Sequence, residues 1–253
     1  MQKTKAIATK KLNIEKLKEH FKNRTGFDIK DLLAFYQQHE KEVKQTTVNW
    51  RVYALVQMGI LQRIGRGKFS LGESRKYLPE VTPKIKRIYN KVKKEFPYLD
   101  ICIWNSSTLS TFMLHQPGKF YYLVEVEKEA TNTVFYFLRE NKFAVFIDPT
   151  QDILEKYSPL EKDILIVKAL VSEAPVLSIN GILTASIEKI LVDIFCDQVI
   201  FSAQQGAEMR TVFNEALHKY TVSHSKMLRY ADRRNKKDPF DKFLKSITNL
   251  RQQ

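Results

Sequence analysis

The stretch KQTTVNWRVYALVQMGILQRIGRGKFSLG, residues 44–72, decides the fold of the first part of the chain. Its first half carries apolar residues at i, i+4, i+7 and i+8, the spacing of one helix face: Val48, Val52, Leu55 and Val56. Thr46 or Thr47 can cap the start of this helix, and Gly59 can end it. The runs LQRI and KFSL then flank Gly65-Arg66-Gly67, so the second half predicts a hairpin with a basic tip.

Two further helices are predicted upstream of this stretch. Residues 11–23 and 27–42 each show helical spacing of apolar positions, which are Ile14, Leu17, Phe21, Ile29, Leu32, Leu33 and Tyr36. Three helices followed by a basic hairpin are typical of a winged helix-turn-helix. In that fold the third helix enters the major groove of DNA, and the wing lies along the phosphate backbone.

The face of the third helix opposite its apolar stripe is polar and aromatic. We expect DNA contacts from the helix start, from this face and from the wing: Lys44, Gln45, Thr46, Thr47, Asn49, Trp50, Arg51, Arg63, Arg66 and Lys68. Two alternatives remain open. The module could contact a protein instead of DNA, and Trp50 could pack in the core.

Basic residues are concentrated towards the two ends of the chain. The 253 residues carry a formal charge of +14. Residues 1–76 contain 17 basic and 7 acidic side chains and residues 223–253 contain 9 and 3, whereas residues 77–222 contain 16 and 18. This distribution favours an anionic partner, and we expect double-stranded DNA.

The remainder of the chain follows another pattern. Residues 72–83 form a polar stretch with two prolines, which is typical of a linker. From residue 98, strand-like runs alternate with helical runs, and the chain ends in helices. We therefore expect a winged-helix domain at residues 1–76 and a mixed α/β domain with a helical C-terminal end at residues 77–253. The fold class is α+β or α/β.

A helix predicted directly after the linker has a strongly basic outer side, made of Lys84, Lys86, Arg87, Lys91, Lys93 and Lys94. This charge run is either a solvated face or a contact with phosphates.

The run TASIEKILVDIFCD, residues 184–197, predicts another helix, for which Thr184 is the expected cap. Lys189 and Asp193 stand four residues apart on its expected exposed side, where such a pair contributes about 0.2 to 0.5 kcal/mol.

A second dense group of cations occupies the predicted helix at residues 224–237 and its exit: Arg229, Arg233, Arg234, Lys236 and Lys237. Like charges at helical spacing repel one another unless an anionic partner meets them. The group is therefore expected to be a second DNA contact, a surface for a protein partner, or a solvated face.

The sequence contains no specific catalytic constellation, and we expect neither an enzyme nor a bound cofactor or metal. The 8 glycines form no phosphate-binding loop, and the five histidines have no zinc-ligand spacing. The best enzymatic candidate is a pair of strand carboxylates, Asp100 and Glu125, near Glu127-Lys128, as in metal-dependent nucleases. Its spacing departs from the nuclease pattern of acid-x-Lys.

Cys102 and Cys196 lie far apart in apolar runs, which favours buried thiols over a disulfide. No run reaches the ~18 apolar residues that a membrane helix needs, and residues 1–11 lack the apolar stretch of a signal peptide. We therefore expect a cytoplasmic protein without a membrane partner.

Two segments together resemble the AbiEi family of antitoxins from bacterial type IV toxin-antitoxin systems. The segment MGILQRIGRGKFSL, residues 58–71, is similar to the family's wing, and residues 185–193, ASIEKILVD, are similar to its motif Ala-x-Pro-Glu-basic-Ala-Leu-x-Asp. Ile187 stands where the family has proline and Ile190 where it has a small residue, so the chain would be a divergent member.

The resemblance implies a transcriptional regulator that binds an inverted-repeat operator in its own promoter through the winged helix. It also implies an antitoxin domain that counters a nucleotidyltransferase-like toxin encoded by a neighbouring gene. Two alternatives from other classes are a metal-dependent nuclease and a winged-helix repressor that responds to a small ligand.

Overall fold

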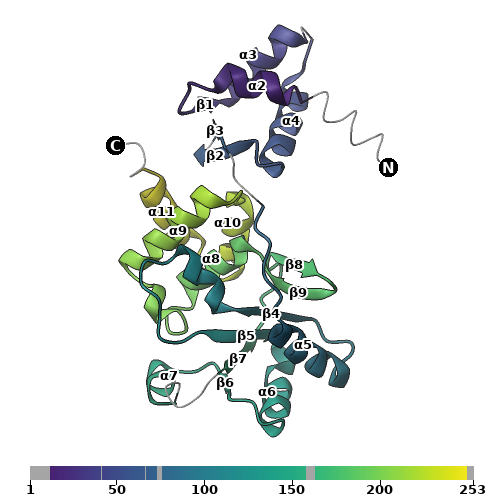
Figure 1. Ribbon diagram of the computed structural model, residues 1–253, viewed down its shortest axis with the longest axis vertical. Helices are drawn as coiled ribbons and strands as arrows, with labels where there is room; N and C mark the ends of the chain where they lie inside the picture. Colours follow the sequence, from purple (N-terminus) through teal and green to yellow (C-terminus); the bar gives the residue numbers. More distant parts are fainter. Residues whose placement is uncertain (1–11, 41, 66, 73–75, 158–162, 250–253) are drawn as a thin grey trace. The chain divides into compact units, whose positions relative to one another are not determined.

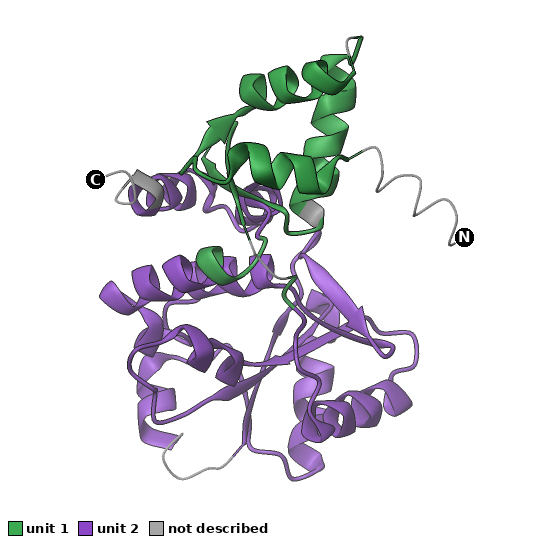
Figure 2. Ribbon diagram, turned by 45° about the horizontal axis from the view of Figure 1, so that its top comes forward, with its two compact units in different colours: residues 1–77, 217–221, 248–253 green, residues 78–216, 222–247 purple. Residues whose placement is uncertain are grey.

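The computed structural model describes residues 12–40, 42–65, 67–72, 76–157 and 163–249. The chain forms two compact units, shown in Figure 2. Unit 1 comprises residues 1–77 with 217–221 and 248–253, and unit 2 comprises residues 78–216 with 222–247. Both contain helices and a sheet, so the protein belongs to the mixed α+β class.

Unit 1 is built from helices and a small antiparallel sheet. In chain order its elements are α2 Ile14–Phe21, β1 Phe27–Asp28, α3 Ile29–His39, α4 Gln45–Gln57, β2 Leu61–Gly65 and β3 Lys68–Leu71. The strand order is β1-β3-β2, with Phe27 opposite Phe69 and Leu61 opposite Leu71.

The apolar stripes predicted from the sequence form the core of unit 1. Val48, Val52, Leu55 and Val56 of α4 are all buried, as are Leu17 and Phe21 of α2. Phe21 stacks on Phe27 with 3.9 Å between ring centroids, which joins α2 to β1. This burial confirms the helical periodicity predicted from the sequence. In a domain this small, only one side of each helix can be covered.

The start of α4 differs from the prediction. The residue before the helix is Lys44, whose side chain makes no capping hydrogen bond, and Thr46 lies within the first turn. The end agrees with the prediction, because Gly59 takes a φ of 72°, which only glycine adopts at little cost. By contrast α3 has a full cap: Asp28 accepts from the amides of Lys30 and Asp31 at 2.7 and 3.0 Å.

Unit 2 contains a six-stranded sheet. The first elements are α5 Pro83–Glu95, β4 Ile101–Asn105, η1 Ser106–Phe112, β5 Tyr121–Val126, η2 Lys128–Ala130, α6 Thr131–Glu140, β6 Val145–Ile147 and α7 Gln151–Tyr157. Next come β7 Ile164–Ala169, β8 Val176–Ile179, β9 Ile182–Ala185, α8 Ile187–Cys196 and η4 Ser202–Gln204. The last helices are α9 Ala207–Lys219, α10 His224–Arg233 and α11 Lys237–Asn249, and the final residues of α9 and α11 belong to unit 1.

The sheet is mixed, with the strand order β6-β7-β5-β4-β9-β8. The pairs β6·β7, β5·β7 and β4·β9 are parallel, whereas β4·β5 and β8·β9 are antiparallel. Asn180 and Gly181 form the turn that joins β8 to β9, with φ values of 52° and 81°.

Helices cover both faces of this sheet, as Figure 1 shows. Alternate strand residues such as Ile103, Val124 and Val167 pack with α5 and α6. The residues between them, which include Trp104, Glu125 and Lys168, point to the face on which α8 lies. The central strands β4, β5 and β7 are therefore largely buried on both sides, and α8 meets polar groups on the face that it covers.

The cap of α8 is another difference. Thr184 lies on β9, and Ser186 caps the helix by accepting from the amide of Lys189 at 3.4 Å. The Thr184 side chain is buried, and its Oγ1 finds no hydrogen-bond partner among the described residues.

Candidate functional site

The outer face of α4 carries most of the predicted DNA contacts. Lys44, Gln45, Thr46 and Asn49 are exposed, and Thr47 is half-buried. The Gln45 amide donates to Asn49 Oδ1 at 3.1 Å across one helix turn. The exposed side chains of Lys44, Gln45, Thr46 and Asn49 are available to an external partner.

Two aromatic side chains extend this face. Trp50 and Tyr53 are 55% and 58% exposed, so the alternative in which Trp50 packs in the core is wrong. Two large rings exposed one turn apart on a single helix are unusual, because each leaves apolar area in contact with water.

Arg51 is a correction to the predicted contact set. It is 4% exposed, lies with its guanidinium 4.7 Å from the Tyr36 ring centroid, and donates to Glu40 at 2.6 Å. Helical spacing turns residue 51 towards α3, where the flat guanidinium can stack on an aromatic ring. Arg51 therefore holds α3 and α4 together and does not reach an external ligand.

The β2–β3 hairpin presents cations beside α4. Arg63 and Lys68 are exposed, and the guanidinium of Arg63 lies 5.7 Å from the Phe69 ring centroid. Arg66, predicted at the tip, lies outside the described residues. Gly67 has a φ of 70°, as the predicted turn requires.

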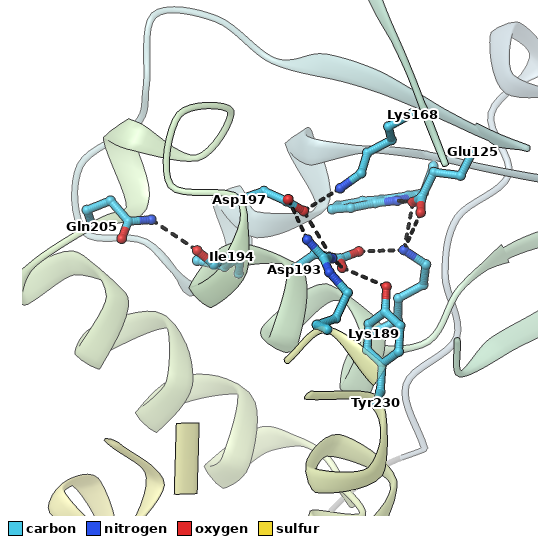
Figure 3. Close-up of polar contacts among 10 residues, drawn as sticks. Glu125, Lys168, Lys189, Asp193, Ile194, Asp197, Gln205 and Tyr230 are labelled. Atoms are coloured by element: carbon cyan, nitrogen blue, oxygen red, sulfur yellow. Dashed lines mark hydrogen bonds and ion pairs between the residues drawn. The ribbon is translucent and has the colours of Figure 1, made fainter. Parts of the chain in front are cut away.

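A buried network of charges lies between the sheet and α8 in unit 2 (Figure 3). Its centre is Lys189, which is fully buried. The Lys189 ammonium lies 2.7 Å from both carboxylate oxygens of Glu125 on β5 and 2.5 Å from Asp193 Oδ2 one turn along α8. Trp104 Nε1 also donates to Glu125, at 2.8 Å.

The network continues from Asp193 to the end of α10. Arg234 donates to Asp193 at 2.7 Å and to Asp197 at 2.6 Å, and the Tyr230 hydroxyl donates to Asp193 at 2.9 Å. Lys168 on β7 pairs with the same Asp197. Three cations thus meet three carboxylates, so the network has no net charge. It joins β5, β7, α8 and α10.

The surroundings keep Lys189 and Asp193 in their charged forms. Burial alone would lower the pKa of Lys189, but Asp193 and Glu125 outweigh it and hold that pKa well above its ordinary value. Burial would raise the pKa of Asp193, and Lys189, Lys168 and Arg234 together lower it. Burial, reinforced by Asp193, raises the pKa of Tyr230. A lysine held in its charged form is not a nucleophile, so the network acts as a structural clamp.

The prediction for Lys189 and Asp193 was therefore wrong about their environment, although right that they pair. Every residue of α8 from Ile187 to Ile194 is buried, because α10 covers the side that would otherwise face solvent. The i, i+4 spacing was enough to predict that Lys189 and Asp193 pair. Nothing local in the sequence indicated that α10 covers the outer side of α8.

The C-terminal cations are mostly engaged within unit 2. Arg234 belongs to the clamp, Arg233 pairs with Glu173, and Lys237 lies 3.5 Å from Asp232. Arg229 and Lys236 are exposed. Arg234 is a correction to this predicted surface group, because its side chain is directed into the protein and pairs with Asp193 and Asp197.

The candidate nuclease carboxylates do not come together as a site. Glu125 is buried and bonded to Lys189 and Trp104, whereas Asp100, Glu127 and Lys128 are exposed. Within the described part of the chain, no group of three or more His, Cys, Asp or Glu side chains is placed to hold a metal ion.

Comparison with known proteins gives one result. The profile of a family of unknown function (DUF6577) matches residues 47–250, which include most of α4, the hairpin and all of unit 2. No curated protein matches the chain. None of the helices in the described residues combines the length and apolar content that crossing a bilayer requires.

Proposed function

We propose that this chain, which belongs to a family of unknown function (DUF6577), is a DNA-binding transcriptional regulator whose unit 1 is a winged helix. In this proposal α4 enters the major groove and the β2–β3 hairpin lies along the phosphate backbone. Three helices and a hairpin in this order match the arrangement of that fold.

The observation that carries the proposal is the outer face of α4. Gln45 and Asn49 are exposed amides at i, i+4, and amide side chains form bidentate contacts with adenine in the major groove. Trp50 and Tyr53 supply apolar surface on the same helix, suited to contact with thymine methyl groups. Arg63 and Lys68 supply the cations for phosphates next to the groove.

The experiment measures binding of the full chain to duplex DNA from upstream of its own coding sequence, by fluorescence anisotropy at stepped salt concentrations. Asn49→Ala should weaken binding to the preferred sequence by about 1 to 3 kcal/mol and leave random DNA nearly unchanged. Arg63→Gln with Lys68→Gln should weaken both DNAs and lower the salt slope by about 1.8, or about 0.9 for each lost phosphate contact. Wild-type affinity and slope in both variants would refute the proposal.

The antitoxin role is a further part of the same proposal, and it rests on the resemblance to the AbiEi family. The matching segment, residues 185–193, is buried throughout. That segment therefore belongs to the core of unit 2, and a toxin would have to bind another surface. Co-expression with the product of a neighbouring nucleotidyltransferase-like gene tests this role: the wild-type chain should restore growth, and unchanged toxicity would contradict it.

A ligand-responsive repressor is a second candidate, favoured by a pocket of about 500 Å³ in unit 2. Phe195, Val199 and Ile200 give it an apolar side, and Asp148 and Lys236 are charged groups at its wall. Its volume lies within the range of small-molecule sites. A small-molecule screen by thermal shift, repeated on Phe195→Ala, tests it: a stabilising compound that the variant no longer binds would support this candidate.

A further inference from the structure

The outer face of α5 carries cations without partners in the described structure. Lys84 pairs with Asp163, and Lys93 donates to the carbonyl of Leu99 at 2.8 Å. Lys86, Arg87 and Lys94 are exposed and have no ion pair or side-chain hydrogen bond to any described residue. The structure therefore separates two tethered lysines from three free cations. Lys91, the remaining cation of the predicted face, is half-buried with its ammonium 6.0 Å from the Phe143 ring centroid.

The three cations form one stripe with Asn90. Ile85, Ile88 and Val92 are buried and fix the inner side of α5. At about 100° per residue, Lys86, Arg87, Asn90 and Lys94 all lie within about 55° of the opposite direction. From residue 86 to residue 94 the stripe is about 12 Å long, because each residue of a helix rises about 1.5 Å.

Helix electrostatics oppose this arrangement. Lys86 and Arg87 lie near the start of α5, where the helix dipole is positive, and the first turn contains no acidic residue. Lys91 stands four residues after Arg87 and three residues before Lys94, which adds repulsion, whereas Lys94 itself lies in the last turn, where the helix dipole favours a cation. The Lys86–Arg87 end of the stripe is therefore unfavourable by itself and becomes favourable when anions meet it.

The chemistry of the stripe distinguishes between anionic partners. Protein interfaces have an apolar or aromatic centre and are depleted in lysine, whereas this stripe consists of Lys, Arg, Asn and Lys. Those side chains are the usual donors to phosphate oxygens. Duplex DNA presents one phosphate for about every 1.7 Å of its axis, so a stripe of about 12 Å faces several phosphates at once.

We propose that the stripe Lys86, Arg87, Asn90 and Lys94 on α5 is a second DNA contact, which binds the phosphate backbone of duplex DNA without reading its sequence. This inference rests on the proposed function and extends it, because it assigns DNA contact to unit 2 as well as to unit 1. Tyr98, three residues beyond the end of α5 and 97% exposed, is a further hydroxyl donor next to this helix.

The test measures anisotropy of a labelled 30-bp duplex of random sequence with the full chain, at stepped potassium chloride concentrations. The stripe variant is Lys86→Gln, Arg87→Gln and Lys94→Gln. Its matched control removes the same charge from three other exposed lysines of unit 2: Lys128→Gln, Lys226→Gln and Lys242→Gln. The stripe variant should lower the slope of log K against log salt by up to about 2.7, and the control should leave it nearly unchanged.

Two other outcomes would contradict the inference. If the stripe variant and the control have the same slope and affinity, the stripe is a solvated face and the inference fails. If the stripe variant loses binding to poly-L-glutamate but keeps DNA binding, the partner is an acidic protein and the inference also fails. The variant Arg63→Gln with Lys68→Gln separates this inference from the proposed function. A loss of slope in the stripe variant alone would contradict the role of unit 1 while supporting α5.

Discussion

Replacing Lys189 with methionine tests the buried clamp of unit 2. Methionine keeps the length of the lysine stem, so the change removes the ammonium with little loss of packing. Glu125 would then keep Trp104 as its remaining hydrogen-bond donor, and Asp193 would keep Arg234 and Tyr230. The variant therefore leaves one buried carboxylate, that of Glu125, without a cation.

Removing one partner of a buried ion pair costs about 3 to 5 kcal/mol. We expect the upper part of that range, because Lys189 and Glu125 are both fully buried and share two contacts of 2.7 Å. The unfolding free energy falls by about 2 kcal/mol for each molar of urea, so the urea midpoint of unit 2 should fall by about 2 M.

The chain offers a specific reporter for this measurement. Its two tryptophans are Trp50 in unit 1 and Trp104, which is buried against Phe201 in unit 2. Trp50→Phe therefore restricts tryptophan fluorescence to unit 2, and urea unfolding of that background follows unit 2 alone. Lys226→Met, at an exposed position, is the matched control.

Adding Glu125→Gln to Lys189→Met removes the carboxylate charge that the single variant leaves without a cation. The double variant should be more stable than the sum of the two single losses predicts, with a coupling of about 0.5 to 3 kcal/mol. A midpoint for Lys189→Met that equals that of Lys226→Met would refute the reasoning.

Three other predictions concern the stability of the two units. Arg51→Met should lower the unfolding free energy of unit 1 by about 1 to 2 kcal/mol in urea without changing sequence preference in anisotropy, because its guanidinium is bound by Glu40 and Tyr36. Thr184→Val should raise the unfolding free energy of unit 2 in urea by about 1 kcal/mol, because it removes a buried hydroxyl that has no partner among the described residues. Native Lys189 and Tyr230 hold their protons more tightly than the unfolded chain does, so their contribution to stability is complete below about pH 10 and is lost as the pH rises further. Urea midpoints from pH 8 to 11 should show this decline, and Tyr230→Phe should make it shallower.

The sequence predicts unit 1 better than unit 2 because the signals in unit 1 are local. The stripe Val48, Val52, Leu55 and Val56 and the turn at Gly59 need only periodicity and backbone freedom, and both appear in the structure. Arg51 could not be placed in this way, because its burial depends on Tyr36 and Glu40 in another helix.

In unit 2 the strands and most helices are predictable, but their long-range partners are not. Glu125 and Lys189 are 64 residues apart, and Arg234 reaches Asp193 across 41 residues. Local patterning therefore assigned Lys189 to a solvated side and Arg234 to an outward cluster. The alternation of β5 did contain one signal, because a glutamate between two valines of the strand-like run YYLVEV indicates a partner on the covered face.

The selection of bound duplexes from a random-sequence pool tests the DNA-reading role of α4 most directly. The full chain and Asn49→Ala are each mixed with the pool, and the retained duplexes are sequenced over several rounds. The account predicts that the wild-type chain enriches one motif and that Asn49→Ala relaxes it at a defined base pair, with similar total DNA retained. An unenriched pool with the wild-type chain, or an identical motif with Asn49→Ala, would contradict the claim that the outer face of α4 reads DNA.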